Sequence, residues 1–591
     1  MSFPRPSSPH PGHASADSSL TLLRASSFGI LRRDSWQSIS ESPYSLGGAS
    51  RLSTLSDKFS LAPDPRLWGS DLSPDLVEAD DDLHNPELEP NKSSNMKTVP
   101  VNARGLTNVG CLITLLLAVI VLFIGYPIIT YRDQWSTVGY SLGGTNSSGQ
   151  VPSIGNFGLI DLDTPEEAHT RTSSFDGSSM LLVFSDEFNT DGRSFYPGDD
   201  PYWEAEDLHY WATNNLEWYD PEAVTTIGGS LVITFSELSS PKHDLNYQGG
   251  LISSWNKFCF TGGYIETAVK LPGANNVVGM WPAVWTMGNL GRAGYGASLE
   301  GMWPYTYDTC DVGTAPNQTR NGEPIAAVLD GDHAYGGALS YLPGQKLSRC
   351  TCDGESHPGP KHDDGTYVGR SAPEIDVLEA QVGGTPLTGQ VSQSAQWAPF
   401  NRAYVWDNST ENEILADPSV SRLNGFIGSA SQMATSVVTD TNQLCYELVQ
   451  DCYSVYGFQY KPGYDDAYIS WVSNGKTSWT LKAAGLGPDP TVQISARPVP
   501  QEPMYIIMNL GMSKNFGSID FEHLTFPNHM SVDYVRVYQD INRIDIGCDP
   551  KDFPTENYII DYIEAYTNPN LTTWTGDFGK PFPKNSFIEP C

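Results

Sequence analysis

The sequence has few basic residues. Lys and Arg together number 34, against 69 Asp and Glu in 591 residues, so the formal net charge at pH 7 is −35. This charge argues against a nucleic-acid partner, because phosphate binding requires a basic surface. An acidic balance of this size indicates solubility in a secreted environment.

The sequence also lacks the short motifs that bind nucleotides and common cations. It has no P-loop, no dinucleotide fingerprint and no EF-hand spacing. Cys350-Thr351-Cys352 is too short for a zinc knuckle, and no His pattern accompanies it. We therefore expect no required cofactor and no metal centre, and the chain is not expected to be a synthase that polymerises a sugar nucleotide.

Long apolar runs are scarce, and one segment stands out, residues 109–129, with 21 residues and no charge. That length spans a bilayer, and its position far from the N-terminus is unlike a cleaved signal peptide. The alternative is a buried core helix. Lys92, Lys97 and Arg104 precede the segment closely, whereas Arg132 alone follows it. The positive-inside rule then predicts a cytosolic N-terminus, with the chain beyond the anchor luminal or extracellular. We therefore expect a single-pass type II membrane protein of the secretory pathway, in the endoplasmic reticulum, Golgi or plasma membrane.

The segments on either side of this anchor differ in composition. Residues 1–108 are rich in Ser, with 14 in the first 50 positions, and have too little apolar surface to offset the entropy of folding. We expect a disordered cytosolic tail; a phosphorylated or sorting tail is the more specific alternative. Residues 130–179 are expected to form a luminal stem.

The cysteines and glycosylation sequons agree with this orientation. Cys111 lies in the predicted span, and eight cysteines lie beyond it: Cys259, Cys310, Cys350, Cys352, Cys445, Cys452, Cys548 and Cys591. An even number in an oxidising compartment predicts up to four disulfides, whose pairing the sequence does not give. Acceptor sequons beyond the span occur at Asn146, Asn317, Asn408 and Asn570, whereas the sequon at Asn91 is expected to be cytosolic and unused.

Residues 180–540 consist of short aromatic or β-branched runs broken by Gly, Pro and Asn. The runs include residues 181–184, 230–235, 263–271, 504–509 and 532–538. No long helical periodicity competes with them, and many short strands with turn signals predict an all-β sandwich.

Three carboxylates, Glu374, Asp376 and Glu379, fall within six residues of an otherwise apolar segment. On a strand successive side chains alternate, so Glu374 and Asp376 share a face. Glu379 is out of phase unless one extra residue forms a β-bulge, a feature that is frequent at active sites. The plain alternative is an acidic edge strand.

With the bulge, Glu374 and Glu379 act as if four residues apart, about 13 Å between Cα atoms. Retaining glycosidases hold a nucleophile and an acid/base carboxyl about 5 to 5.5 Å apart, whereas inverting enzymes separate them by about 6.5 to 9.5 Å. Two Glu side chains reaching toward each other are compatible with retention, and the spacing leaves inversion open. Asp376 between them would help to separate their pKa values.

Tryptophans are candidates for sugar contact. Trp281 and Trp285 share a face if their segment is extended, and a Trp-lined face stacks against sugar rings. Trp397 is a further candidate of the same kind. The alternative for all three is the buried core.

Taken in order, these segments resemble the family 16 glycoside hydrolases, which are β-glucan-active jelly rolls of concanavalin-like fold. The resemblance covers residues 180–545 and rests on Phe184 to Asn189, Gly263 to Pro272, Trp281 to Trp285, the E-x-D-x-x-E motif at 374–379, and Val532 to Gln539. It implies Glu374 as nucleophile, Asp376 as assisting acid and Glu379 as acid/base. It also implies a possible structural calcium near Glu187 and Asp533, for which surface carboxylates are at least as good an interpretation.

The resemblance narrows to fungal membrane proteins of β-1,6-glucan synthesis, the killer-toxin-resistance group. It rests on the anchor, on residues 310–314, 342–345, 350–352 and 357–360, and on the Cys-containing C-terminal extension 546–591. It implies retaining β-glucan hydrolase or transglycosylase chemistry in cell-wall biogenesis. The alternative is a glucan-binding scaffold without catalysis. Protein partners are not predicted.

An insertion at about 289–370, with three cysteines, is longer than a simple laminarinase needs. Loops of this length are usually functional or disordered. We expect a disulfide-stapled cover near the cleft that excludes water and favours transfer to a sugar acceptor over hydrolysis.

Overall fold

The computed structural model describes residues 103–120 and 158–591. The chain divides into two units, residues 1–105 and 106–591. Helix α2 (Ala103–Ile120) covers the first part of the predicted membrane anchor; residues 121–129 of that anchor, most of the predicted tail and residues 130–157 of the stem lie outside the described residues. Among the residues that are described, no helix is both long and apolar enough to cross a membrane.

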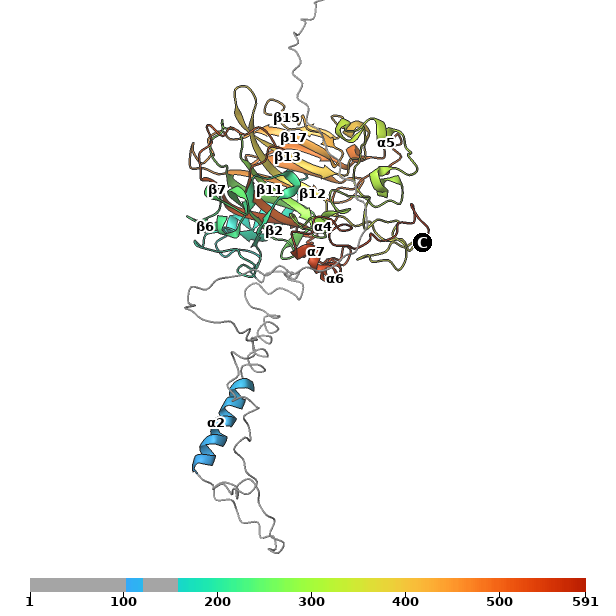
Figure 1. The fold of residues 1–591 in the computed structure, drawn as a ribbon. Helices are drawn as coiled ribbons and strands as arrows, with labels where there is room; N and C mark the ends of the chain where they lie inside the picture. Colours follow the sequence, from blue (N-terminus) through green and yellow to red (C-terminus); the bar gives the residue numbers. More distant parts are fainter. Residues whose placement is uncertain (1–102, 121–157) are drawn as a thin grey trace, which may run out of the picture. The chain divides into compact units, whose positions relative to one another are not determined.

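Two antiparallel sheets face each other in the folded domain (Figure 1). The first sheet, in spatial order, contains β1 (Thr170–Thr172), β2 (Ser179–Asp186), β22 (Asn528–Asp540), β10 (Gly263–Lys270), β18 (Ser454–Lys461), β19 (Tyr468–Ser473), β20 (Lys476–Lys482) and β14 (Glu413–Leu415), with β7 (Ser230–Lys242) and β6 (Val224–Ile227) extending it beside the first half of β22. Because β1 pairs with β2, the sandwich begins inside the segment predicted to be a stem.

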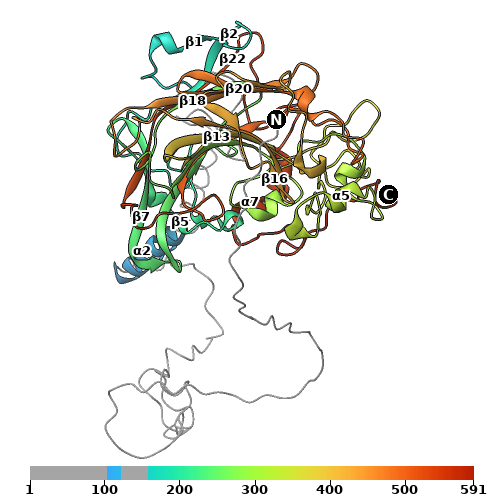
Figure 2. The same ribbon diagram turned by 90° about the horizontal axis from the view of Figure 1, so that it is seen from above.

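The second sheet carries the site described below. Its strands are β3 (Glu204–Ala205), β8 (Leu245–Ser253), β9 (Cys259–Phe260), β21 (Met504–Gly511), β11 (Trp281–Gly288), β12 (Glu374–Gly383), β13 (Thr388–Trp397), β17 (Gln432–Asp440), β15 (Ser421–Leu423) and β16 (Gly428–Ser429). The short strands β4 (Leu208–His209) and β5 (Glu217–Tyr219) join β8, with β5 parallel to it. Seen from above, β18, β20 and β22 lie in one layer and β13 in the other (Figure 2).

Within residues 158–591 the helices are short, and they precede β1, lie between strands or follow the last strand. They are α4 (Gly296–Leu299), α5 (Ala326–Leu329), α6 (Glu556–Asp561), α7 (Ile563–Thr567) and the 3-10 turns η4 (Glu166–Ala168), η5 (Trp211–Thr213), η6 (Pro221–Ala223), η7 (Val312–Thr314), η8 (Pro316–Gln318), η9 (His333–Tyr335), η10 (Arg402–Tyr404) and η11 (Ala483–Leu486). The predicted all-β architecture is therefore confirmed.

The core lies between the two sheets. Fully buried side chains from the first sheet, such as Phe184, Ile265 and Trp471, belong to one apolar cluster with Val284 and Ile375 from the second. Burial of this apolar surface is the main force that holds the sheets together. Hydrogen bonds also join the layers, because the Trp471 indole donates to the Asp376 carbonyl at 2.9 Å.

The bulge predicted in β12 is present. Asp376 pairs with Ser394 and Glu379 with Ser392, so Val377 and Leu378 together face the single residue Gln393. In the pairing with β11, Val284 pairs with Leu378 and Trp285 pairs with Asp376. Val377 has no partner on β11 and is therefore the extra residue of the bulge. The bulge shifts the alternation by one residue, so that Glu379 shares a face with Glu374 and Asp376.

Gln393 stabilises this bulge from inside the core. Its side chain is fully buried, and its amide donates to the Val377 carbonyl at 2.8 Å and to the Val472 carbonyl at 2.9 Å. Its own amide oxygen accepts a hydrogen bond from Ser478 at 2.6 Å. A single side chain thus pairs a carbonyl of the bulge, that of Val377, and a carbonyl of the facing sheet, that of Val472.

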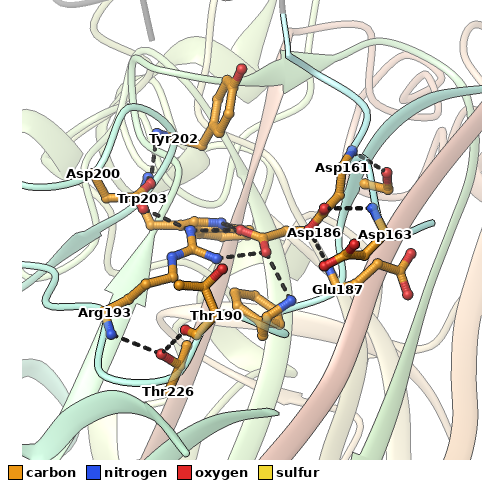
Figure 3. A network of polar contacts seen from close by, with 12 residues as sticks. Asp161, Asp163, Asp186, Glu187, Thr190, Arg193, Asp200, Tyr202, Trp203 and Thr226 are labelled. Carbon is orange, nitrogen blue, oxygen red and sulfur yellow. Dashed lines mark hydrogen bonds and ion pairs between the residues drawn. The ribbon is translucent and has the colours of Figure 1, made fainter. Parts of the chain in front are cut away.

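A second polar network secures the loop that follows β2 (Figure 3). Arg193 donates to both carboxylate oxygens of Asp186, at 2.7 and 2.9 Å, and to Asp200 at 2.6 Å. The indole of Trp203 also donates to Asp186, at 2.9 Å. Buried carboxylates are tolerated where they are paired in this way. Asp186, part of the motif that suggested the family resemblance, therefore has a structural role.

The insertion 289–370 is folded and is joined by disulfides to the rest of the domain. Cys310–Cys350 closes it internally, and Cys352–Cys591 joins it to the C-terminal extension. Cys259–Cys548 attaches the extension to β9, and Cys445–Cys452 closes a surface loop. The predicted four disulfides are confirmed, and Cys111 is free. Both views place α5 of the insertion and the C-terminus on the same side of the sandwich.

The insertion and the extension meet at Glu300, Lys346 and Trp574. A Glu300 carboxylate oxygen accepts the backbone N–H of Trp574 at 2.6 Å. The Lys346 ammonium lies 3.7 Å from the centroid of the Trp574 ring, and burial lowers the pKa of Lys346 to about 7. The two segments therefore form one continuous wall, which we call the insertion wall, beside the second sheet.

Replacing Gln393 tests the origin of the bulge. Gln393→Ala leaves two buried carbonyls without their donor, so the free energy of unfolding is expected to fall by about 3 kcal/mol. The matched control is Gln390→Ala on the same strand, whose buried amide donates to one partly exposed carboxylate, that of Asp440, and a loss of about 1 kcal/mol or less is expected there. Denaturant unfolding of both variants makes the comparison, and equal losses would contradict this account of the bulge.

Candidate active site

A cavity of about 760 Å³ crosses the second sheet. Its floor takes side chains from β8, β21, β11, β12, β13 and β17, so it runs across the strands. Residues 299–301, 303, 342 and 343 of the insertion and Thr572 of the extension line its side. This volume falls in the range of about 300 to 1,000 Å³ that is usual for ligand sites.

All three carboxyl groups of the bulged strand face this cavity. Glu374, Asp376 and Glu379 line it together, which a regular strand would not allow. Burial raises the pKa of Glu374 to about 7 and that of Glu379 to about 8, with like charges on their neighbours adding to the effect. Burial also raises the pKa of Asp376 well above its usual value.

Different hydrogen-bond partners set the three groups apart. Glu374 accepts the indole N–H of Trp303 at 2.5 Å and is also hydrogen-bonded to Asp376. Asp376 accepts the Gln396 amide at 2.8 Å. Glu379 accepts the indole N–H of Trp281 at 3.1 Å. Glu374 therefore has two hydrogen-bond donors that favour its ionised form, the Trp303 indole and the protonated carboxyl group of Asp376. Glu379 has one such donor and retains its proton near neutral pH.

Two of the three predicted tryptophans line the cavity. Trp281 stacks on Phe516, with ring centroids 4.2 Å apart and planes within 2°. Trp285 is 8% exposed, lines the cavity and donates to Asn509 at 2.8 Å.

The prediction for Trp397 is wrong. Its side chain is fully buried in the core, where its indole donates to Thr435 at 2.9 Å. Its neighbour Gln396 lines the cavity instead. Adjacent residues of a strand point to opposite faces, so the position of Trp397 on β13 directs the ring away from the cleft.

Several cavity residues were not predicted from the sequence. Trp303, Tyr210 and Phe426 come from loops and carry no periodic signal. Asn215, Tyr219 and Asn509 form a hydrogen-bonded group in the cavity lining. The Tyr219 hydroxyl accepts the Asn509 amide at 3.1 Å and the Asn215 amide at 3.0 Å. Ser and Gln side chains of β13 and β17 provide further polar lining. Such groups match the many hydroxyls of a carbohydrate.

The two carboxylates considered for a calcium ion do not fit one. Both oxygens of Glu187 accept hydrogen bonds from Arg536, at 2.8 and 2.7 Å. Burial and the charge of Glu187 raise the pKa of Asp533. Within residues 103–120 and 158–591, no group of three or more His, Cys, Asp or Glu residues is placed to hold a metal ion. The Arg536 guanidinium supplies the positive charge at this position.

The glycosylation predictions remain predictions. Asn317, Asn408 and Asn570 are exposed, so their side chains are accessible to a glycosyltransferase. Asn146 lies outside the described residues.

The fold and the cavity together define a class, an antiparallel β-sandwich that holds three carboxyl groups in one cavity from a bulged strand. Residues 70–591 match the family described as "Beta-glucan synthesis-associated protein SKN1/KRE6/Sbg1". The chain belongs to this family, which confirms the resemblance drawn from the sequence.

Individual relatives agree with this assignment. The β-glucan synthesis-associated protein KRE6 of Saccharomyces cerevisiae is 41% identical over 532 residues, covering 88% of this chain and 69% of that protein. SKN1 of Candida albicans is 42% identical over 530 residues, covering 88% of this chain and 67% of that protein.

Weaker similarities extend beyond the family. The endo-1,3-1,4-β-glycanase ExsH of Rhizobium meliloti is 26% identical over 284 residues, covering 41% of this chain and 55% of that protein. The catalytic domain of a Thermotoga petrophila laminarinase is 19% identical, covers 62% of this chain and all of that domain, and has a TM-score of 0.35.

Proposed function

We propose that this protein is a membrane-anchored retaining β-glucan hydrolase or transglycosylase that acts in the biosynthesis of fungal cell-wall β-1,6-glucan. The observation that carries the proposal is the bulged strand β12, which directs Glu374, Asp376 and Glu379 into one cavity. The relatives named above are β-glucan synthesis-associated proteins, which supports glucan as the ligand class.

The chemistry follows from the different surroundings of the carboxyl groups. Glu374, as carboxylate, attacks the anomeric carbon while Glu379 gives its proton to the glycosidic oxygen, and the bond between that carbon and that oxygen breaks. A covalent glycosyl-enzyme on Glu374 results. Glu379, now ionised, takes the proton of an incoming hydroxyl, which attacks the anomeric carbon and releases Glu374. Asp376 and the Trp303 indole are hydrogen-bonded to Glu374, so they stabilise its carboxylate before it attacks the sugar and again after the glycosyl group has been released from it.

The identity of the incoming hydroxyl decides between hydrolysis and transfer. The insertion wall places Trp303, Leu299 and Pro343 along one side of the cavity. These apolar side chains limit the water beside the glycosyl-enzyme, while the polar lining of β13 and β17 offers hydrogen bonds to an acceptor sugar. This arrangement supports transfer to a glucan acceptor as the main reaction.

The proposal includes the membrane topology derived from the sequence. Residues 109–129 form the anchor, and the sandwich lies in the lumen of the secretory pathway or at the cell surface. Four disulfides in the sandwich support this side of the membrane, because disulfides persist in oxidising compartments.

The second candidate is a glucan-binding scaffold that has the fold but no catalysis. Its support is that the cavity has aromatic and polar lining sufficient for binding without bond cleavage. A cell that produces only the Glu374→Gln protein, at wild-type abundance, separates the two candidates. Normal β-1,6-glucan in that cell would favour the scaffold and would rule out the catalytic proposal.

Labelling tests the nucleophile directly. Purified folded domain incubated with a fluorinated β-glucan oligosaccharide, which slows release of the glycosyl-enzyme, is expected to gain the mass of one glycosyl group on the peptide that contains Glu374. Glu374→Gln should lose turnover by on the order of a thousandfold and lose the label. Glu564→Gln, at an exposed carboxylate on α7, is the control and should retain both. Label on another residue would refute the assignment, and analysis of products from defined oligosaccharides separates transfer from hydrolysis.

Trp303→Phe tests the contribution of the insertion to the nucleophile. Loss of the indole donor destabilises ionised Glu374, so its pKa is expected to rise by about one unit. Turnover needs this carboxylate ionised, so the acid limb of the pH profile of kcat/KM should shift to higher pH while the alkaline limb, set by Glu379, stays in place. Trp218→Phe is the matched control, since Trp218 donates to Asp207 outside the cavity. An unshifted acid limb would contradict this role.

Glycan occupancy tests the topology. The full chain made in a fungal host is expected to run at lower mass after endoglycosidase digestion. Each of Asn317→Gln, Asn408→Gln and Asn570→Gln should remove one glycan, whereas Asn91→Gln should change nothing. A chain that carries no glycan, or one on Asn91, would exclude the proposed orientation.

A further inference from the structure

We propose that Tyr335 and Tyr341, on the insertion, form a second sugar-binding platform that continues the cavity and holds a β-glucan chain extending from it. We call this pair the tyrosine platform. The inference rests on the proposed function, because its ligand is the same class of glucan.

The two rings are exposed and lie close together. Tyr335 is 44% exposed and Tyr341 64% exposed, with ring centroids 5.1 Å apart and planes inclined by 42°. Among the residues that the structure describes, none forms a hydrogen bond with either hydroxyl. Aromatic faces pack against the apolar C–H faces of β-linked pyranose rings, and the free hydroxyls are available to sugar hydroxyls.

The platform is continuous with the cavity along the chain. Tyr341 directly precedes Leu342 and Pro343, which line the cavity. Its backbone N–H donates to the carbonyl of Ala430 at 2.6 Å.

The sequence neighbours of Ala430 also place Tyr341 beside the cavity lining. Ser429 and Ser431, on either side of Ala430, both line the cavity. Phe426, 49% exposed, lines it as well. A glucan chain that crosses the second sheet toward β17 and the adjoining turn therefore leaves the cavity beside Tyr341.

The loop that carries Tyr335 is fixed in position. The Tyr404 hydroxyl donates to the Ala338 carbonyl and accepts the Asp332 backbone N–H, both at 3.0 Å. The Asp332 side chain accepts the N–H of Ala334 at 2.8 Å and so caps η9. At Gly331 a Cβ atom would lie 2.1 Å from the Ala338 carbonyl oxygen, so the turn requires glycine. A platform that is ordered before binding loses little conformational entropy when a ligand binds.

A polysaccharide fits this surface better than a protein does. Ile325 and Leu329, which precede Tyr335 in sequence, and Val405, which follows Tyr404, are exposed and would support a protein interface. The two tyrosine rings, however, contact each other, and Tyr341 adjoins residues that line the cavity, so an extended polysaccharide leaving the cavity is the occupant that would use both rings at once.

Binding measurements test the platform without depending on catalysis. The full chain carrying Glu374→Gln, which should not turn over, is titrated with a long soluble β-glucan and with a trisaccharide short enough to stay within the cavity. Adding Tyr335→Ala and Tyr341→Ala is expected to weaken polymer binding about tenfold and to leave trisaccharide binding unchanged. Tyr196→Ala, at an exposed ring outside the cavity, is the control and should change neither.

Conservative variants identify the interaction. Replacing both tyrosines by Phe retains stacking and should keep most of the polymer affinity. Tyr404→Phe removes only the hydroxyl that holds the loop, and should cause a smaller loss than the double Ala change. Ile325→Ser with Leu329→Ser should leave glucan binding unaltered.

The outcomes separate the two proposals. Polymer affinity that is unchanged in the double Ala variant, or that falls equally for the trisaccharide, would overturn the platform while leaving the cavity as a glucan site. A reduction caused by Ile325→Ser and Leu329→Ser but not by the tyrosine changes would overturn it in favour of the apolar surface. Absence of binding to any glucan would overturn the proposed function and the platform with it.

Discussion

The structure depends on one extra residue in one strand. β12 directs carboxylates toward the cavity and aliphatic side chains toward the core. At Val377 the alternation between these two faces shifts by one residue. If the same residues formed a regular strand without the bulge, Glu379 would face the core, where an ionised carboxyl is costly. Gln393 and Trp471 stabilise the bulge from the core side of β12, because they donate hydrogen bonds to its backbone carbonyls. The packing of the core and the geometry of the site therefore constrain each other.

The carboxyl groups share a buried environment and are separated by their donors. Burial raises the pKa of each one, but Glu374 has an indole and a neighbouring acid as partners, whereas Glu379 has a single indole. The indole on Glu374 belongs to Trp303, far from β12 in sequence. One chemical site is therefore built from a strand and from an insertion, and disulfides join that insertion through the C-terminal extension to β9 of the second sheet.

Charged groups elsewhere serve the fold. Asp186 and Glu187 lie in residues 184–189, a segment on which the resemblance drawn from the sequence rested, yet each is paired with an arginine, Arg193 or Arg536. These bidentate pairs hold the end of β2 and its following loop against the sandwich. Resemblance in sequence alone would not separate these structural carboxylates from those that line the cavity, whereas their partners do.

The sequence by itself determined the all-β class, the number of disulfides, and the phase shift that brings Glu379 beside Glu374, because each rests on local periodicity or on simple counting. Only the tertiary structure decided which aromatic rings meet the cavity. Trp285 and Trp397 are the same residue type on neighbouring parts of one sheet, but the position of each along its strand sends one ring to the cleft and the other to the core. Trp303 lies in a segment without periodicity, so its place at the cleft follows from long-range packing and cross-links, which local sequence patterns do not contain.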